Sequence, residues 1–341
     1  MSQQSFVILG IESSCDDTSA AVLKDDTILS NITASQSIHE QYGGVVPELA
    51  SRAHQQNIIP VVDAALKKAA LQLKDIDLIA FTQGPGLMGS LVVGTAFAKS
   101  LSLALNKPMV AVHHMHAHIL AHFINEGVPV PQFPFICLTV SGGHTQLVRV
   151  DAPTEMTVLG STIDDAAGEA FDKTAKILGF PYPGGPLVDN YAKEGNPDAF
   201  TFSKPQVDGY NFSFSGLKTS VLYFIQKELA KNPNFIEENK ADLCASIQAT
   251  ILEILFKQLR KVSADTGIKE IAIAGGVSAN SGLRAKLAEE GKNRGWNVFI
   301  PKFEYCTDNA AMIAIAGKFL AEKNLFAGQE TSANARLPFV R

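Results

Sequence analysis

Apolar residues in the first part of the chain alternate between strand-length runs and helical spacing. The strand-length runs are expected to form five strands, at 6–11, 19–23, 27–32, 77–82 and 109–112. Helical spacing begins at Pro47, a residue well suited to a first helical position, and predicts a long helix there. A second helix, rich in glycine, alanine and serine, is expected to end near Leu105. The pattern therefore predicts an α/β unit in this part of the chain.

The later part of the chain opens in the same way, with a strand, a tight turn and a return strand. Its expected strands lie at 135–140, 145–150, 270–274 and 297–300. Its expected helices lie at 167–178, 214–229 and 241–262, with one after residue 280 and a last one from Asp308. Two parts that open alike predict an internally duplicated α/β architecture with a helical middle.

Composition narrows the class of protein. With 341 residues the chain is long enough for two domains, and 46% hydrophobic residues exclude a disordered chain. The formal net charge of −5 provides no global positive field that would attract nucleic acid. A nucleic-acid substrate would therefore require a local basic patch or the charges of a partner.

Cysteine usage and the N-terminal residues bear on the compartment. The four cysteines are far apart and form no C-x-x-C pair, which argues against a disulfide framework and fits a reducing compartment. The first residues lack a basic segment, and no apolar run approaches the roughly 20 residues of a membrane helix. We therefore expect a cytoplasmic protein without a membrane segment.

Histidines are concentrated in one segment. Five of the eight histidines fall between residues 113 and 122, after an expected strand. His114 and His118 are four residues apart, so on a helix both rings leave the same face and can converge on one ion. The alternative is a solvated histidine-rich turn. Asp308 is the best candidate for a third ligand, although it is also a good helix N-cap. Imidazole and carboxylate ligands leave iron and zinc both open.

The histidine pair does not match the zinc-protease motif H-E-x-x-H. Met115 follows the first histidine, where that motif has its catalytic glutamate. A metal at this place is expected to hold an anionic ligand rather than to activate water for peptide hydrolysis. A metallopeptidase nevertheless remains an alternative on the histidines alone.

Glycine-rich turns at three places have the form of phosphate or nucleotide contacts. They lie at 140–145, 182–186 and 274–280, each at a strand or helix end. Each alone is also an ordinary turn, and none matches the P-loop or a clean G-x-G-x-x-G motif. Asp172, in the acidic segment 164–173, is a candidate acceptor for a ribose hydroxyl, as acidic residues are in other nucleotide sites.

These motifs together resemble the tRNA N6-adenosine threonylcarbamoyltransferase family, named TsaD in bacteria and formerly described as O-sialoglycoprotein endopeptidase-like. The resemblance rests on segments at 10–18, 42–52, 113–118, 140–146, 164–173, 182–186, 212–219, 275–280 and 306–309. They follow one another in order along nearly the whole chain.

The resemblance implies an actin-like, Hsp70-like fold of two lobes with duplicated ribonuclease-H-like cores and a helical insertion in the second lobe. The N-terminal lobe is expected at 1–112 and the C-terminal lobe at 113–322. The tail from about 323 to 341 is expected to pack back on the first lobe.

The resemblance also implies an activity. A member of this family transfers the threonylcarbamoyl group from threonylcarbamoyl-AMP to N6 of adenosine 37 in tRNAs that read codons beginning with A (t6A synthesis). The alternatives are a metallopeptidase and an actin-like ATP-binding scaffold without catalysis. The implied partners are tRNA, a metal-free paralogous protein (TsaB) and a small P-loop ATPase (TsaE).

Site residues carry over from the family position by position. The implied metal ligands are His114, His118 and Asp308, which would hold one divalent ion, iron or zinc, with Fe2+ favoured. The implied contacts to an adenylate or ATP-type ligand are Thr139, Val140, Ser141, Gly142, Gly143, Asp172, Gly185, Asp189 and Asn280. From its place in the first turn, Glu12 is a candidate general base or a structural residue.

Overall fold

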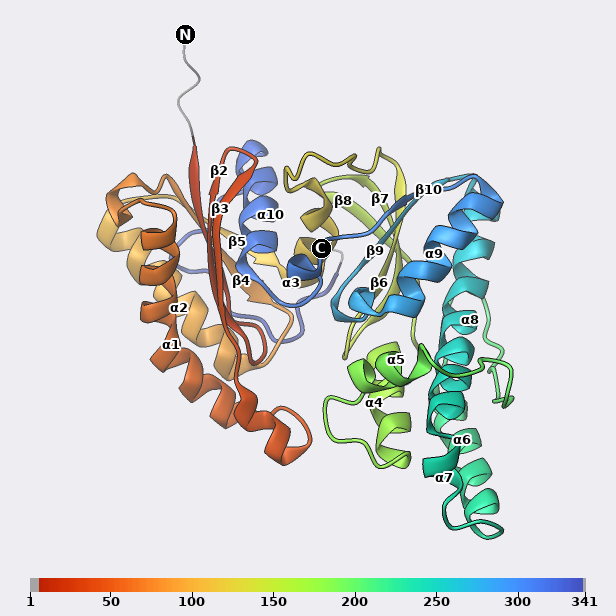
Figure 1. Ribbon diagram of the computed structural model, residues 1–341. Coiled ribbons are helices and arrows are strands. Elements are labelled where there is room, and N and C mark those ends of the chain that lie inside the picture. The colour runs from red at the N-terminus through yellow and green to blue at the C-terminus, as the bar shows by residue number, and fades with distance from the viewer. Residues whose placement is uncertain (1–5, 340–341) are drawn as a thin grey trace. The chain divides into compact units, whose positions relative to one another are not determined.

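The computed structural model describes residues 6–339, which form two compact α/β units (Figure 1). Within the described residues, the first unit comprises 6–130, 152–155 and 301–339. The second comprises 131–151 and 156–300. These limits differ from the expected lobes, because the segments 113–130 and 301–322 belong to the first unit. Helices in both segments pack on the first sheet, so the boundary follows packing rather than chain order.

The first unit contains a five-stranded mixed sheet in the order β3-β2-β1-β4-β5. Its strands are β1 (Val7–Glu12), β2 (Thr18–Lys24), β3 (Thr27–Ala34), β4 (Leu78–Gly84) and β5 (Met109–His113). Its helices are η1 (Ser37–Tyr42), α1 (Pro47–Lys68), η2 (Leu73–Asp75), α2 (Met88–Leu105), α3 (His114–Leu120), η3 (Ala121–Phe123), η5 (Phe303–Tyr305) and α10 (Ala310–Glu322). Strand β1 is antiparallel to β2 and parallel to β4.

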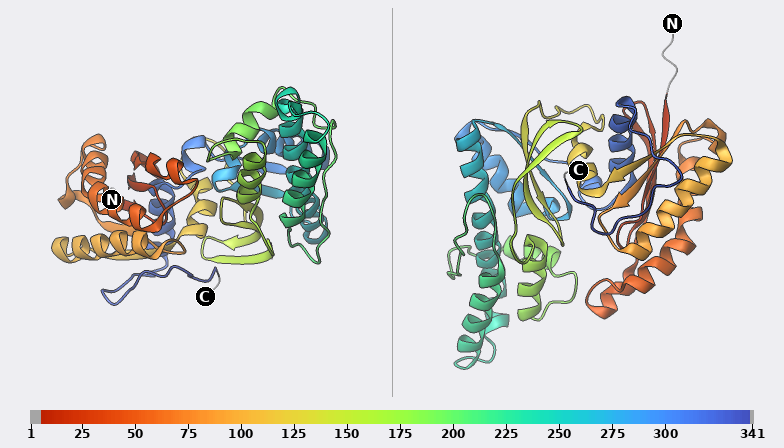
Figure 2. Two further views of the ribbon diagram at one scale, coloured as in Figure 1. Left: turned by 90° about the horizontal axis from the view of Figure 1, so that it is seen from below. Right: turned by 180° about the vertical axis from the view of Figure 1, so that it is seen from behind.

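Helices cover both faces of this sheet. Helices α1 and α2 lie against one face, and α3 and α10 lie against the other (Figures 1 and 2). Helix α10 approaches β1 very closely, since a Cβ atom on Gly10 would lie 2.4 Å from the Ala310 carbonyl oxygen. Glycine is therefore required at this contact, which fixes where the loop before α10 meets the end of β1.

The second unit repeats the topology of the first. Its strands are β6 (Phe135–Val140), β7 (Thr145–Ala152), β8 (Glu155–Ser161), β9 (Glu270–Ala274) and β10 (Asn297–Phe299). Their order is β10-β9-β6-β7-β8, with β6 antiparallel to β7 and parallel to β9. Each strand thus has a counterpart in the first sheet, and the predicted duplication is confirmed.

The helical middle of the second unit lies between β8 and β9. Its helices are α4 (Ala167–Ile177), α5 (Gly185–Ala192), α6 (Ser215–Leu229), α7 (Phe235–Glu238) and α8 (Lys240–Thr266), followed by η4 (Gly276–Ala279) and α9 (Ser281–Arg294). Apolar side chains of α4, α6 and α8 form one buried core with β6 and β9. Strand β8 and the short α7 are not evident from the sequence pattern, because both carry few buried apolar residues.

Helix α2 is the one helix within residues 6–339 that is long and apolar enough, by length and composition, to cross a bilayer. It packs against β4 and α1. A single helix of this kind is weak evidence for a membrane segment, because core helices of globular proteins meet the same criteria.

The carboxylate of Asp164 closes the N-terminus of α6. It accepts hydrogen bonds from the backbone N–H groups of Phe214 (2.7 Å) and Ser215 (3.3 Å). It also accepts them from the hydroxyls of Ser213 (2.5 Å) and Ser215 (2.9 Å). Two sequence motifs far apart in the chain, 164–173 and 212–219, are thereby joined by a non-local helix cap.

This cap gives a stability prediction. Burial raises the pKa of Asp164, but the hydrogen bonds outweigh it, so its pKa in the folded protein is lowered. The ionised carboxylate therefore stabilises the fold above its unfolded pKa of about 3.9, and this contribution is lost as the pH falls through the folded value. Asp164→Asn is expected to lower the free energy of unfolding by about 1 kcal/mol at neutral pH. Urea titrations should show that this difference shrinks below pH 4. A difference independent of pH would contradict the assignment.

Candidate metal centre

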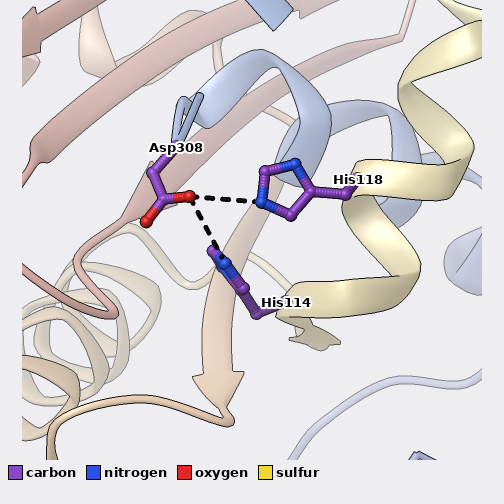
Figure 3. Close-up of side chains that lie close together, drawn as sticks. All are labelled: His114, His118 and Asp308. Atoms are coloured by element: carbon purple, nitrogen blue, oxygen red, sulfur yellow. Dashed lines mark hydrogen bonds and ion pairs between the residues drawn. The ribbon is translucent and has the colours of Figure 1, made fainter. Parts of the chain in front are cut away.

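The histidine-rich segment forms the junction of a strand and a helix in the first unit. Strand β5 ends at His113 and α3 begins at His114, and Nδ1 of His113 accepts the backbone N–H of Met115. His114 and His118 therefore lie one turn apart on α3, with ring centroids 4.7 Å apart. Asp308 reaches the same place from the loop before α10 (Figure 3).

The three side chains have the spacing of ligands to one ion. Oδ1 of Asp308 lies 3.4 Å from Nε2 of His114 and 3.2 Å from Nε2 of His118. The three candidate ligand atoms all lie within 4.8 Å of one another. Ligand atoms about 2.1 Å from a tetrahedral metal are separated by about 3.4 Å, so the set fits a metal such as iron or zinc. The structure thus brings all three predicted ligands together.

The alternative role of Asp308 as a helix cap does not hold. Helix α10 begins at Ala310, and its N-cap is Asn309, whose side-chain oxygen accepts the backbone N–H of Met312. This leaves the Asp308 carboxylate to the two histidines. His114 and His118 are 8% and 2% exposed, whereas the Asp308 side chain is 27% exposed, so the centre is buried on the histidine side and open to solvent at Asp308.

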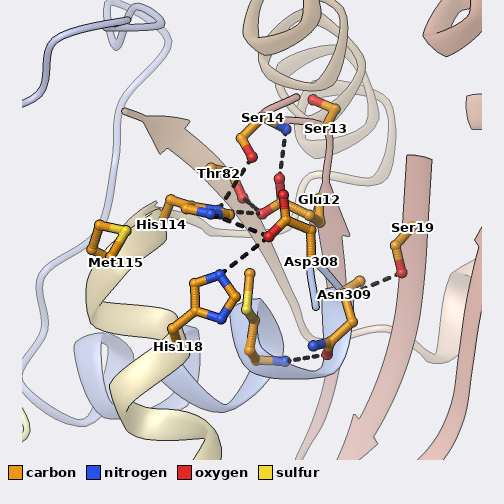
Figure 4. A network of polar contacts seen from close by, with 12 residues as sticks. Glu12, Ser13, Ser14, Ser19, Thr82, His114, Met115, His118, Asp308 and Asn309 are labelled. Carbon is orange, nitrogen blue, oxygen red and sulfur yellow. Dashed lines mark hydrogen bonds and ion pairs between the residues drawn. The ribbon is translucent and has the colours of Figure 1, made fainter. Parts of the chain in front are cut away.

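A second layer of side chains orients His114 (Figure 4). Nδ1 of His114 lies 3.2 Å from Oε2 of Glu12 and 3.2 Å from the hydroxyl of Ser14. Because a carboxylate only accepts hydrogen bonds, Nδ1 carries the hydrogen in its bond to Glu12. In the neutral ring Nε2 is then unprotonated, and this is the nitrogen that faces Asp308. A carboxylate behind a histidine is a frequent arrangement in metal sites.

The carboxylate of Glu12 is itself fixed by hydrogen bonds. Its Oε2 accepts the hydroxyl of Thr82 at 2.6 Å, and its Oε1 accepts the backbone N–H of Ser14 at 2.5 Å. Its side chain is completely buried. Burial raises the pKa of Glu12, but the charge and hydrogen bond of His114 outweigh it and lower that pKa. The buried oxygens of Glu12 thus already accept hydrogen bonds from Thr82, Ser14 and His114, which suits an orienting residue better than a general base that must reach a substrate proton.

The electrostatic field of the centre favours a cation. Burial alone lowers the pKa of His114, but the charges of Asp308 and Glu12 raise it well above its ordinary value. Burial raises the pKa of Asp308, and the two histidines lower it far below its ordinary value. Two carboxylates facing one imidazole thus stabilise positive charge at this place, as a metal ion requires.

Removing the charge of Glu12 provides a test of its orienting role. Glu12→Gln keeps the size of the side chain but weakens the hold on Nδ1 of His114. Metal affinity, measured by competition with a chelator, is expected to fall by about 10- to 100-fold. Glu48→Gln, at an exposed ion pair on α1, serves as a control and should leave it unchanged. An unaltered affinity in Glu12→Gln would show that Glu12 does not orient the ligand.

The second unit contains a cavity of about 250 Å3 lined by its glycine-rich turns. Five of the residues predicted to contact an adenylate line it: Gly142, Asp172, Gly185, Asp189 and Asn280. The cavity has other lining residues that the sequence did not assign as individual contacts, among them Phe171, Pro183 and Val277. Pro183 and Val277 nevertheless lie inside the predicted turns 182–186 and 274–280, and Phe171 lies in the acidic segment 164–173. A cavity of this kind accommodates a small organic ligand.

The other four residues predicted to contact the adenylate do not line the cavity. Thr139 and Val140 are buried in β6, and the hydroxyl of Ser141 accepts the backbone N–H of His144. Gly143 lies beside Gly142 but is not among the lining residues. The structure therefore places Gly142, alone among residues 139–143, at the cavity wall.

The acidic lining residues hold the walls of the cavity in place. Oδ1 of Asp172 accepts the backbone N–H groups of Gly184 (2.8 Å) and Gly185 (3.0 Å). Burial raises the pKa of Asp172 despite these bonds. Asp189 accepts the backbone N–H and hydroxyl of Ser281, at the start of α9. Both carboxylates thus organise the turns that surround the ligand space.

Comparisons with known proteins agree along the whole chain. A family model described as tRNA N6-adenosine threonylcarbamoyltransferase matches residues 27–315. A protein of that name from Christiangramia forsetii is 62% identical over 340 residues, covering 99% of this chain and 100% of the relative. Another from Riemerella anatipestifer is 60% identical over 331 residues, covering 97% of each chain.

Solved structures of similar fold are more distant in sequence. A structure of full-length HypF, in a phosphate- and nucleotide-bound form, matches with a TM-score of 0.61 and 14% identity, covering 95% of this chain and 47% of that one. Component A of (R)-2-hydroxyglutaryl-CoA dehydratase from Acidaminococcus fermentans matches with a TM-score of 0.54 and 15% identity, covering 93% and 99%. At these identities the likeness concerns the fold, and it agrees with the predicted actin-like architecture.

Proposed function

The chain belongs to the tRNA N6-adenosine threonylcarbamoyltransferase family, and we propose that it transfers the threonylcarbamoyl group of threonylcarbamoyl-AMP to N6 of adenosine 37 in tRNAs that read codons beginning with A. The observation that carries this proposal is the His114–His118–Asp308 centre in a chain that matches the family throughout. A metallopeptidase is not favoured, since Met115 stands where a zinc protease has its glutamate.

His114, His118 and Asp308 hold one divalent ion in this proposal. Two imidazoles and one carboxylate are the protein ligands of many non-haem iron sites and of catalytic zinc sites, and we favour Fe2+. When bound, such an ion supplies Lewis acidity toward an oxygen of the donor and orients it. Glu12 and Ser14 orient the ring of His114, and both histidine ligands are buried.

The cavity of the second unit holds the adenylate part of the donor. Gly142 and Gly276 line it, and a Cβ atom on either would meet no atom within 4 Å, so their backbones border open ligand space. Asp172 and Asp189 keep the turns around it in place, and Asn280 lines it at the start of α9. We assign Thr139, Val140, Ser141 and Gly143 the role of shaping the turn that presents Gly142.

The chemistry requires no covalent intermediate on the protein. The exocyclic amine of adenosine attacks the carbamoyl carbon, the bond from that carbon to the phosphate oxygen of AMP breaks, and N6 releases one proton to the solvent. Burial raises the pKa of the Cys15 and Cys137 thiols, which makes them poor nucleophiles. Binding and orientation of the donor are therefore the main contribution of this chain.

The partners and compartment follow from the same proposal. The substrate is tRNA, and the net charge of −5 favours a composite tRNA-binding surface. We therefore propose that a metal-free paralogue (TsaB) and a small P-loop ATPase (TsaE) act with this chain. The four cysteines are free, as in a protein of the reducing cytoplasm.

A reconstituted reaction tests the function. The purified chain, its bacterial partners and the adenylate-forming enzyme are supplied with threonine, bicarbonate, ATP and a tRNA that reads a codon beginning with A. Nucleoside mass spectrometry is expected to detect threonylcarbamoyl-adenosine only when this chain is present. No product from metal-loaded protein with active partners would refute the proposal.

A further inference from the structure

The last described residues, 327–339, form an irregular segment with turns at 329–330 and 335–336 that packs on the first unit, and we call this segment the C-terminal strap. Ala327 pairs with Met109 at the edge strand β5. Further along, the backbone N–H of Asn334 donates to the Gln83 carbonyl, and that of Gly86 donates to the Ala335 carbonyl. A Cβ atom on Gly84 would lie 1.9 Å from the Asn334 carbonyl oxygen, so the strap lies directly against the end of β4.

The strap ends on His113 and His116, two histidines of the cluster that are not metal ligands. Nε2 of His116 donates to the Phe339 carbonyl oxygen at 2.8 Å. The Phe339 ring meets His116 and His113 edge-on, with centroids 4.5 Å and 5.4 Å apart. His113 and His116 stack on each other at 4.3 Å. Phe339 thus packs on a histidine pair at the start of α3.

This contact lies on the side of α3 away from the metal ligands. His116 is two residues from both His114 and His118, so its side chain leaves the helix about 200° around from theirs. Helix α3 has only seven residues, too few to be stable without packing on both sides. Asp308 faces the ligand side, and Phe339 faces the opposite side.

We propose that the C-terminal strap is a positioning element of the metal centre, with Phe339 fixing the orientation of α3 so that His114 and His118 converge on one ion. The proposal rests on the metal site proposed above. Phe339 contacts His113 and His116 and acts on the ligands through them. The strap therefore sets metal affinity from outside the ligand shell.

Metal titration of the purified full chain tests this positioning role. Zn2+ affinity is measured by competition with a chelator, and Co2+ absorption reports the geometry around the ion. Phe339→Ala, and a chain that ends at Pro338, are each expected to bind Zn2+ about tenfold more weakly with an altered Co2+ spectrum. Phe339→Tyr keeps the ring and is expected to restore both. Phe326→Ala, at a half-exposed aromatic just before the strap, is the matched control.

The outcomes separate the two proposals. If the unaltered chain binds no metal, the metal site itself is refuted. If it binds Zn2+ while Phe339→Ala matches it within about twofold, with the same Co2+ spectrum, the positioning role is refuted. If Phe326→Ala weakens Zn2+ binding as much as Phe339→Ala does, the positioning role is also refuted. The loss of affinity would then reflect general loosening of the C-terminal segment. If the shortened chain does not fold, the Phe339→Ala and Phe339→Tyr pair decides.

Discussion

Replacement of His118 by alanine is expected to abolish metal binding and to reduce threonylcarbamoyl transfer by roughly 10³-fold or more. His118 is almost completely buried, and its Nε2 lies 3.2 Å from the Asp308 carboxylate. Without it, one imidazole and one carboxylate remain, too few protein ligands to hold an iron or zinc ion. Metal content by mass spectrometry and product formation by nucleoside analysis should fall together.

Suitable controls separate this effect from damage to the fold. His122→Ala removes a histidine of the same cluster that lies beyond α3, on η3, and should retain the metal. Asp308→Asn keeps the size of the third ligand but removes its charge, and is expected to weaken binding less than His118→Ala. If His118→Ala retained a full equivalent of metal and normal activity, the ligand assignment would be overturned.

The sequence predicted most of the fold because its apolar patterns are regular. The strands at 135–140 and 270–274 appear in the structure with the same limits, and the helix expected from Pro47 begins there. Strand β8 was missed because it alternates weakly between buried and exposed residues. Lobe limits were misplaced for a different reason: the packing of α3 and α10 on the first sheet is a long-range property that local patterns do not encode.

The sequence predicts the two histidine ligands more directly than it predicts Asp308. Two histidines four residues apart lie on the same face of a helix. Asp308 and Asn309 are adjacent and both are good helix caps, so only the register of α10 shows that Asn309 takes the cap. The orienting role of Glu12 also needs the fold, because β1 and α3 meet only in the assembled unit. Phe339 carries no motif, and its contact with the histidines emerges from the path of the strap.

Gly142→Leu is expected to weaken binding of AMP to the isolated chain by about 100-fold, a loss of about 2.7 kcal/mol. Gly142 lines the cavity of the second unit, and a Cβ atom there would meet no atom within 4 Å. The leucine side chain therefore has room within the protein but occupies space in a cavity of only about 250 Å3. The expected loss comes from exclusion of ligand, so the free energy of unfolding should change by less than about 0.5 kcal/mol.

A graded series makes this prediction decisive. Gly142→Ala adds a single methyl group and should weaken AMP binding far less than Gly142→Leu, because most of the cavity stays open. Ala230→Leu places the same side chain at an exposed helix end outside the cavity and should leave binding unchanged. Calorimetric titration with AMP measures all three variants. Because the metal ligands belong to the first unit, Gly142→Leu should keep its full metal content. AMP binding by Gly142→Leu within about threefold of the unaltered chain would place the nucleotide elsewhere.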